Sequence, residues 1–87
     1  MSTKISSTVQ RAIKIINYLN EVSGLQGVKE ISDNLNISPT ITHRLLTTLK
    51  MEGLVFQDPD SKKYSLGTAF IEYANKINSD LPIASCK

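Results

Sequence analysis

The chain has 87 residues, a formal net charge of +2 and a hydrophobic content of 40%. This length suits one small domain with a modest core. The single cysteine, Cys86, excludes an internal disulfide and fits a reducing cytoplasm. The polar start does not resemble a signal peptide, and no run approaches the roughly 20 apolar residues of a membrane span, so we expect a cytoplasmic protein without a membrane partner.

The charges are unevenly distributed along the chain. No acidic residue lies within residues 34–51 or within residues 61–71, and the second range contains the adjacent pair Lys62 and Lys63. Two basic windows without acids predict one positive face rather than a uniformly basic protein. Chance spacing of acids in short windows is the alternative.

The first predicted helix has Ser7 or Thr8 as its N-cap and ends near Val22, before Gly24, with residues 1–7 flexible. One apolar stripe at helical spacing is expected to face the core: Val9, Ala12, Ile13, Ile16 and Leu19. A second stripe lies beside it: Ile15, Tyr18 and Val22.

The second stripe is more apolar surface than an outer helix of a small domain needs. Either the domain encloses this helix from two sides, or Ile15, Tyr18 and Val22 form a homodimer interface. A two-fold dimer of this kind would place one face of this helix against the same face of its mate.

A short helix is predicted over residues 28–35, followed by Asn36, which tolerates left-handed geometry in a tight turn. Ser38 as N-cap and Pro39 at the first helical position begin the next helix, which ends near Glu52 before Gly53. Two helices joined by such a turn are typical of a helix-turn-helix.

After Gly53 the pattern predicts a hairpin of two brief strands, from Leu54 and from Lys63, joined by turn residues 58–61. A last helix follows from Gly67 to about residue 78, with an apolar side of Phe70, Ile71, Ala74 and Ile77, and Asp80-Leu81-Pro82 breaks it. The predicted fold is mainly α: a winged helix-turn-helix over residues 8–78 with a three-helix core, a two-stranded wing and a C-terminal linker helix, and residues 79–87 begin an interdomain linker.

The helix over residues 38–52 divides into an apolar side and a polar side. Ile41, Leu45, Leu46 and Leu49 are expected to be buried, and the opposite side is polar. The major groove of B-DNA accepts one α-helix, and arginine can bind guanine with two hydrogen bonds. The predicted DNA-binding residues are Ser38, Thr40, His43, Arg44, Thr47 and Lys50 on this helix, and Lys62 and Lys63 on the wing.

Each assignment has a structural alternative. His43 can be a solvated helix residue, Arg44 can pair with Glu52 or Asp33, and Lys50 can complement the helix dipole. The two wing lysines can simply keep a hairpin soluble.

Catalysis is not expected from this inventory. One histidine, one cysteine near the C-terminus and no glycine-rich phosphate loop leave no nucleophile–base pair, no metal-ligand cluster and no cofactor site. The remaining rival is a winged helix that contacts protein in a larger assembly, and the basic, acid-free third helix argues against it.

Four segments together resemble the N-terminal domain of the IclR family: VQRAIKIINYL from Val9, VKEISDNLNIS from Val28, THRLLTTLKMEGLV from Thr42 and KYSLG from Lys63. The resemblance covers about residues 8–78. It implies a homo-oligomeric bacterial repressor or activator that binds double-stranded DNA and whose larger C-terminal domain binds a small-molecule effector.

That second domain is absent from the 87 residues, which suggests a truncated protein or a stand-alone fragment. The chain departs from the family at Pro39, where members often carry a basic residue, so early base contacts are harder to assign.

Overall fold

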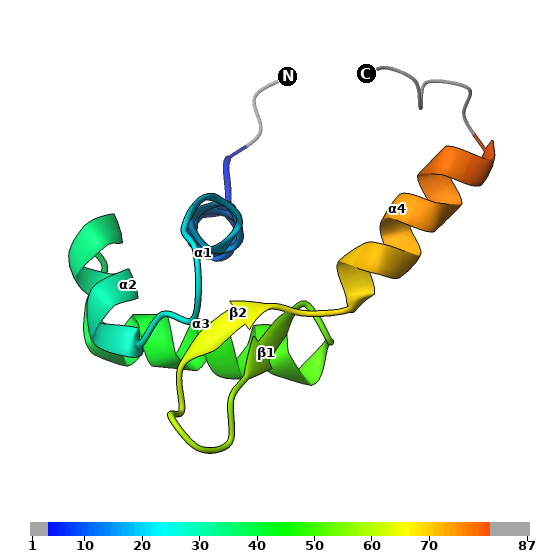
Figure 1. Cartoon of the computed structure of the whole chain (residues 1–87). Coiled ribbons are helices and arrows are strands. Elements are labelled where there is room, and N and C mark those ends of the chain that lie inside the picture. The colour runs from blue at the N-terminus through cyan, green and yellow to red at the C-terminus, as the bar shows by residue number, and fades with distance from the viewer. Residues whose placement is uncertain (1–3, 81–87) are drawn as a thin grey trace.

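The computed structural model describes residues 4–80. It contains four helices and one two-stranded antiparallel sheet, in the order α1 (Ser7–Glu21), α2 (Val28–Leu35), α3 (Pro39–Met51), β1 (Val55–Gln57), β2 (Tyr64–Leu66) and α4 (Ala69–Asp80). Helices α1, α2 and α3 pack together, and the hairpin lies against α3 and α1 (Figure 1). The predicted winged helix-turn-helix fold is confirmed.

Helix α1 begins one residue earlier than predicted. The Ser6 side chain caps it by accepting a hydrogen bond from the Val9 backbone N–H at 3.3 Å, so Ser7 is already helical. The flexible segment predicted over residues 1–7 therefore extended one residue too far. Residues 1–3 lie outside the described residues. Extended backbone at Val22 ends the helix.

The turn between α2 and α3 has the predicted geometry. Asn36 adopts a left-handed conformation with φ 56° and ψ 45°, and its N–H donates to the Ser32 carbonyl. The Ser38 side chain accepts from the Ile41 N–H at 3.2 Å, and Pro39 occupies the first turn of α3. These caps satisfy backbone groups that the helix cannot pair internally, and they fix where α3 begins.

The wing pairs Val55 with Leu66, Phe56 with Ser65 and Gln57 with Tyr64. At its tip, the Ser61 backbone N–H donates to the Asp58 carboxylate at 2.7 Å and holds the pKa of that carboxyl below its usual value. A further bridge joins Gln26 to Tyr64 on the outer side of β2, through backbone hydrogen bonds of 2.9 and 2.7 Å. The segment between α1 and α2 is therefore attached to the wing by one bridged residue beside β2.

The core brings residues from three helices and the wing together. Its buried members are Ile15, Leu19, Ile31, Leu45, Leu46, Leu49, Val55 and Tyr64. Burial of the four fully enclosed side chains, Ile15, Ile31, Leu46 and Thr42, excludes solvent from the centre. Apolar burial of this kind supplies most of the stability of a small domain.

The core covers part of the predicted stripe of α1: Ala12, Ile16 and Leu19. Ile15 is fully buried, whereas Val9 and Ile13, placed on the predicted core stripe, are 55% and 50% exposed. The prediction failed because the apolar arc of α1 is broad, and the elements packed on it, α2, α3 and β2, decide which part is covered.

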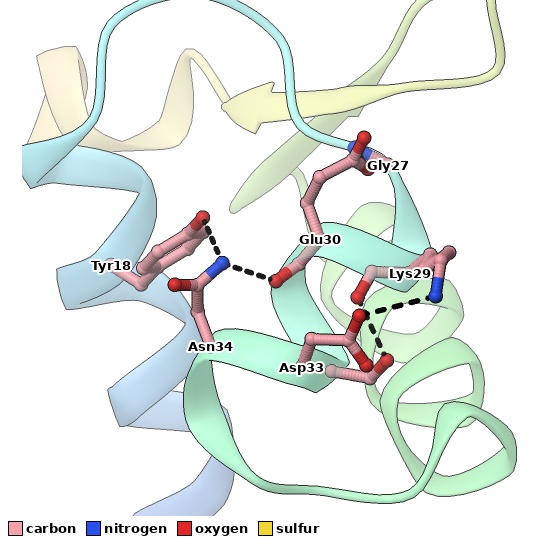
Figure 2. A network of polar contacts seen from close by, with 7 residues as sticks. Tyr18, Gly27, Lys29, Glu30, Asp33 and Asn34 are labelled. Atoms are coloured by element: carbon pink, nitrogen blue, oxygen red, sulfur yellow. Dashed lines mark hydrogen bonds and ion pairs between the residues drawn. The ribbon is translucent and has the colours of Figure 1, made fainter.

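Tyr18 is also turned into the domain. Its hydroxyl donates to Gln26 Oε1 at 2.9 Å and accepts from Asn34 Nδ2 at 3.2 Å, and Asn34 donates in turn to the Glu30 carbonyl. Figure 2 shows Tyr18 reaching from α1 toward α2, where Asn34 meets it. The predicted dimer interface of Ile15, Tyr18 and Val22 is therefore wrong for Ile15, which has no exposed surface, and Tyr18 is half-buried in an internal network.

Helix α4 leads away from the rest of the domain (Figure 1). None of its residues is buried, and Ile71, Tyr73 and Ile77 are 62%, 51% and 46% exposed. The helix extends to Asp80, two residues past its predicted end, so the described part of the predicted linker, residues 79–80, is helical. Residues 81–87, including the predicted break at Leu81-Pro82, lie outside the described residues.

No helix within residues 4–80 has the length and apolar character needed to cross a membrane.

Candidate DNA-binding surface

Helix α3 is anchored on one side and exposed on the other. Leu45, Leu46 and Leu49 are buried as predicted, and Ile41 is half-buried against the core. Thr42, which the sequence pattern did not assign to either side, is fully buried on this same side. The buried face prevents α3 from rotating, so the direction of its exposed side chains is set by the core.

The exposed face carries the predicted residues Thr40, His43, Arg44, Thr47 and Lys50. Thr48 and Met51 belong to the same face and were missed, although helical spacing from Arg44 and Thr47 would have indicated them. The face offers a guanidinium, an imidazole, an ammonium group and several hydroxyls without one carboxylate. Such a surface is suited to the base edges and phosphates of a DNA groove.

The hydroxyls of the exposed face are held by the helix backbone. Thr47 Oγ1 donates to the His43 carbonyl at 2.9 Å, and Thr48 Oγ1 donates to the Arg44 carbonyl at 3.1 Å. Each hydroxyl oxygen therefore remains available as an acceptor. The Ser38 oxygen accepts the capping hydrogen bond, which leaves its own proton and one further lone pair for the predicted contact with DNA.

Arg44 has no acidic partner in the described part of the chain. The ion pairs within residues 4–80 join Lys29 to Asp33 at 3.3 Å and Lys76 to Asp80 at 2.7 Å. Asp33 is thus occupied by Lys29 on the preceding turn of α2, and neither predicted alternative partner of Arg44 engages it. The guanidinium is exposed and available to a ligand.

Lys50 has a more specific position than the sequence indicated. Its Nζ donates to Gln57 Oε1 at 3.0 Å, and Gln57 Nε2 donates to the Lys62 carbonyl at 3.1 Å. This chain of contacts ties the end of α3 to β1 and to the tip of the wing. Gln57 was not anticipated, because nothing in a local pattern shows that a strand residue faces a lysine seven positions earlier.

The two wing lysines differ in their surroundings. Lys62 lies in the turn with a positive φ of 66°, close enough to Asp58 for its charge to contribute to the lowered pKa of that carboxyl. The Lys63 stem instead runs past Gly27 at the start of α2, and its Cγ would lie 3.9 Å from a Cβ at that glycine. Both residues are exposed, and Lys63 directly precedes β2, where its carbonyl accepts from the Asp58 N–H at 2.8 Å.

The helix-turn-helix and the first strand of the wing match a known protein family. The family model described as the IclR helix-turn-helix domain matches residues 8–59, more than half of the chain. The chain belongs to the IclR family.

Two curated relatives come from Escherichia coli (strain K12). This IclR-family chain is 30% identical over 79 residues to the HTH-type transcriptional regulator XynR, covering 91% of the chain and 31% of XynR. It is 31% identical over 67 residues to the HTH-type transcriptional repressor AllR, covering 77% of the chain and 25% of AllR. The chain therefore spans about a third of the length of these relatives or less.

A solved structure gives the same result for the fold. The IclR transcriptional regulator from Alicyclobacillus acidocaldarius superposes with a TM-score of 0.79 at 29% identity, over 88% of this chain and 31% of that one. The likeness to this regulator therefore covers more of the chain than the residues that the family model matches.

Proposed function

We propose that this chain binds double-stranded DNA in transcription regulation, with α3 in the major groove and the wing on the backbone or in the adjacent minor groove. The observation that carries the proposal is the exposed face of α3, which projects polar and basic side chains from a helix locked by its other side. Membership of the IclR family and the transcriptional regulators among its relatives support the same function. A winged helix used for protein contact is not favoured by an acid-free face of this kind.

Arg44 is the proposed reader of a base. It is exposed, lies mid-way along α3 and has no acidic partner within residues 4–80, so its guanidinium can engage guanine O6 and N7. Thr40 supplies a hydroxyl and a methyl group, which suit phosphate and thymine contacts, and Thr47 supplies a methyl group for thymine. Pro39 has no side-chain donor, so base reading would begin beyond the first residue of the helix.

The experiment begins by selecting a preferred duplex from a random pool and measuring its affinity across a salt series. Arg44→Ala should weaken the selected duplex by about 1–3 kcal/mol and reduce preference at one base pair. Lys14→Ala, an exposed basic residue on α1, is the matched control and should leave that preference unchanged. A wild-type affinity for duplex DNA that does not change with salt would contradict DNA binding, because phosphate contacts release counterions.

We further propose that the protein acts as a homodimer on a near-palindromic operator. The surface that fits this role is the exposed apolar side of α1, where Val9 and Ile13 lie four residues apart with exposed fractions of 55% and 50%, and Ile5, just before the helix, is 73% exposed. It replaces the interface first predicted on this helix. Two copies related by a two-fold axis would place their α3 helices in successive major grooves.

Sedimentation measures this association directly. Val9→Glu together with Ile13→Glu should stay folded, because neither residue is buried, and should lower the association constant. Ile71→Glu on α4 is the control, with a similar exposed isoleucine. If the α4 variant dissociates the dimer and the α1 variant does not, the interface lies on α4.

We assign no catalysis, cofactor or metal to the domain and place it in the cytoplasm, where the DNA of a bacterium lies.

Its relatives extend well beyond the matched region, and we propose that a small-molecule effector acts through such an additional domain. Repression and activation are both compatible with this mode of DNA binding.

A further inference from the structure

A hollow of about 150 Å³ lies between α1 and α3, beside the exposed face of α3. We refer to it as the α1–α3 hollow, and it is lined by Thr8, Arg11, Ile41, Arg44 and Leu45. Arg11 comes from the second turn of α1 and Arg44 from the middle of α3. The two arginines are distant in the sequence, and only the packing of α1 on α3 brings them to one hollow.

The lining concentrates positive charge around a small space. Two arginines and one threonine line it, together with Ile41 and Leu45, and no acidic residue is among the lining residues. Both ion pairs in the described range 4–80 are made by lysines, on α2 and α4, so neither arginine is neutralised by an acid there. Like charges next to an apolar wall repel each other more strongly than they do in open water.

A bound anion would remove that repulsion. Guanidinium groups match the geometry of phosphate oxygens and often bind them in a two-pronged manner. The hollow has room for a group larger than one water, such as a phosphate, because one water needs only roughly 10–15 Å³ of such space. Thr8 adds a hydroxyl that can donate to a further oxygen.

We propose that the α1–α3 hollow binds one phosphate of the DNA backbone and that Arg11 is the residue that contacts it, while Arg44, the proposed reader of a base, adds its positive charge from the side of the groove. The inference rests on the proposed function, because Arg44 belongs to the face of α3 that enters the groove. A phosphate held in the hollow would lie at the edge of that groove and would fix the depth and rotation of α3. Helix α1 then contributes to DNA binding directly, in addition to packing in the core.

Arg11→Gln and Lys14→Gln form the matched pair that tests this inference. Each removes one positive charge from α1, but Lys14 lies away from the hollow, beside Tyr18 and Leu35. Arg11→Gln should weaken selected and random duplexes alike, by about tenfold, since a charged hydrogen bond to phosphate is lost. It should also reduce the log–log salt slope by about 0.9, the contribution of one phosphate contact. Lys14→Gln should change both quantities much less.

The outcomes separate this inference from the function on which it rests. Equal effects of Arg11→Gln and Lys14→Gln in a wild type that binds DNA would overturn the phosphate site alone. A wild type without salt-dependent duplex binding would overturn the proposed function itself. If Arg11→Gln does not fold, Arg11→Lys carries the test, because it keeps the charge and stem and removes the guanidinium fork. A several-fold loss of affinity with an unchanged melting temperature supports the contact, and wild-type affinity overturns it.

Inorganic phosphate distinguishes the source of the anion. It is added to the protein without DNA, at constant ionic strength, and the melting temperature is followed. If free phosphate stabilises the wild type but not Arg11→Gln, while both bind DNA equally, the hollow is a free-anion site and the DNA contact is refuted. Loss of DNA affinity in Arg11→Gln, with or without an effect of free phosphate, supports the backbone contact.

Discussion

Gly67, at the exit from the wing, is the position where a single methyl group should disturb the domain most. Its N–H donates to the Leu54 carbonyl at 2.9 Å, so the chain leaving β2 crosses directly over the chain entering β1. A Cβ at Gly67 would overlap the Gly53 carbonyl oxygen and would lie 2.8 Å from the Leu54 carbonyl carbon and the Val55 nitrogen. These are backbone atoms, so the overlap cannot be relieved by turning a side chain.

Gly67→Ala should therefore destabilise the domain by about 3 kcal/mol, the upper part of the usual range for overpacking. For a domain of this size, that corresponds to a fall of roughly 12–24 °C in melting temperature. Circular dichroism with heating or urea measures it. The loss is large beside a total stability of only about 5–15 kcal/mol.

Gly24→Ala is the matched control, because it tests backbone strain without a steric overlap, whereas Gly67→Ala tests the overlap. Gly24 has a φ of 78°, but a Cβ there would have no atom within 4 Å, whereas Gly67 is outside the left-handed region. The Gly24 variant should cost about 1–2 kcal/mol, from backbone strain alone. If Gly67→Ala proves no more destabilising than Gly24→Ala, the close approach of the two chains does not constrain the wing and the reasoning is refuted.

Three further changes test the core and the wing. Leu46→Ala, at a side chain with no exposed surface, should cost about 2–5 kcal/mol by urea unfolding, and a loss under about 1 kcal/mol would mean that the core collapses to fill the space. The Asp58 carboxyl, whose pKa is lowered from 3.8 chiefly by the Ser61 N–H, stabilises the fold above pH 3.8, and this contribution is lost as the pH falls through the lowered pKa. Asp58→Asn should make the free energy of unfolding depend less on pH below 3.8. If that pH dependence is the same as in the wild type, this carboxyl is not its cause. Lys62→Ala with Lys63→Ala should weaken all duplexes alike and lower the salt slope by roughly one unit for each phosphate that the wing no longer binds, whereas weakening confined to one sequence would show that the wing reads bases.

Local chemistry was enough to predict most of the helix-turn-helix and the position of the wing. Asn36, Ser38 and Pro39 act within two or three residues of themselves, through φ preference, a capping hydroxyl and a ring that fixes φ. Such effects do not depend on the rest of the fold, so the bounds of α2 and α3 were correct to within about one residue. The same holds for the buried leucines of α3, whose spacing alone separates the two sides of the helix.

The orientation of α1 was decided only by the tertiary structure. Its sequence contains two adjacent apolar stripes, and helical periodicity gives no reason to bury Ile15 in place of Val9 and Ile13. That choice depends on where α2, α3 and β2 pack, which is a property of the assembled domain. For the same physical reason, the sequence could not predict that Arg11 lies near Arg44 or that Lys50 contacts Gln57. A capping residue acts on its immediate neighbours, but two side chains from different elements meet only when both elements are in place.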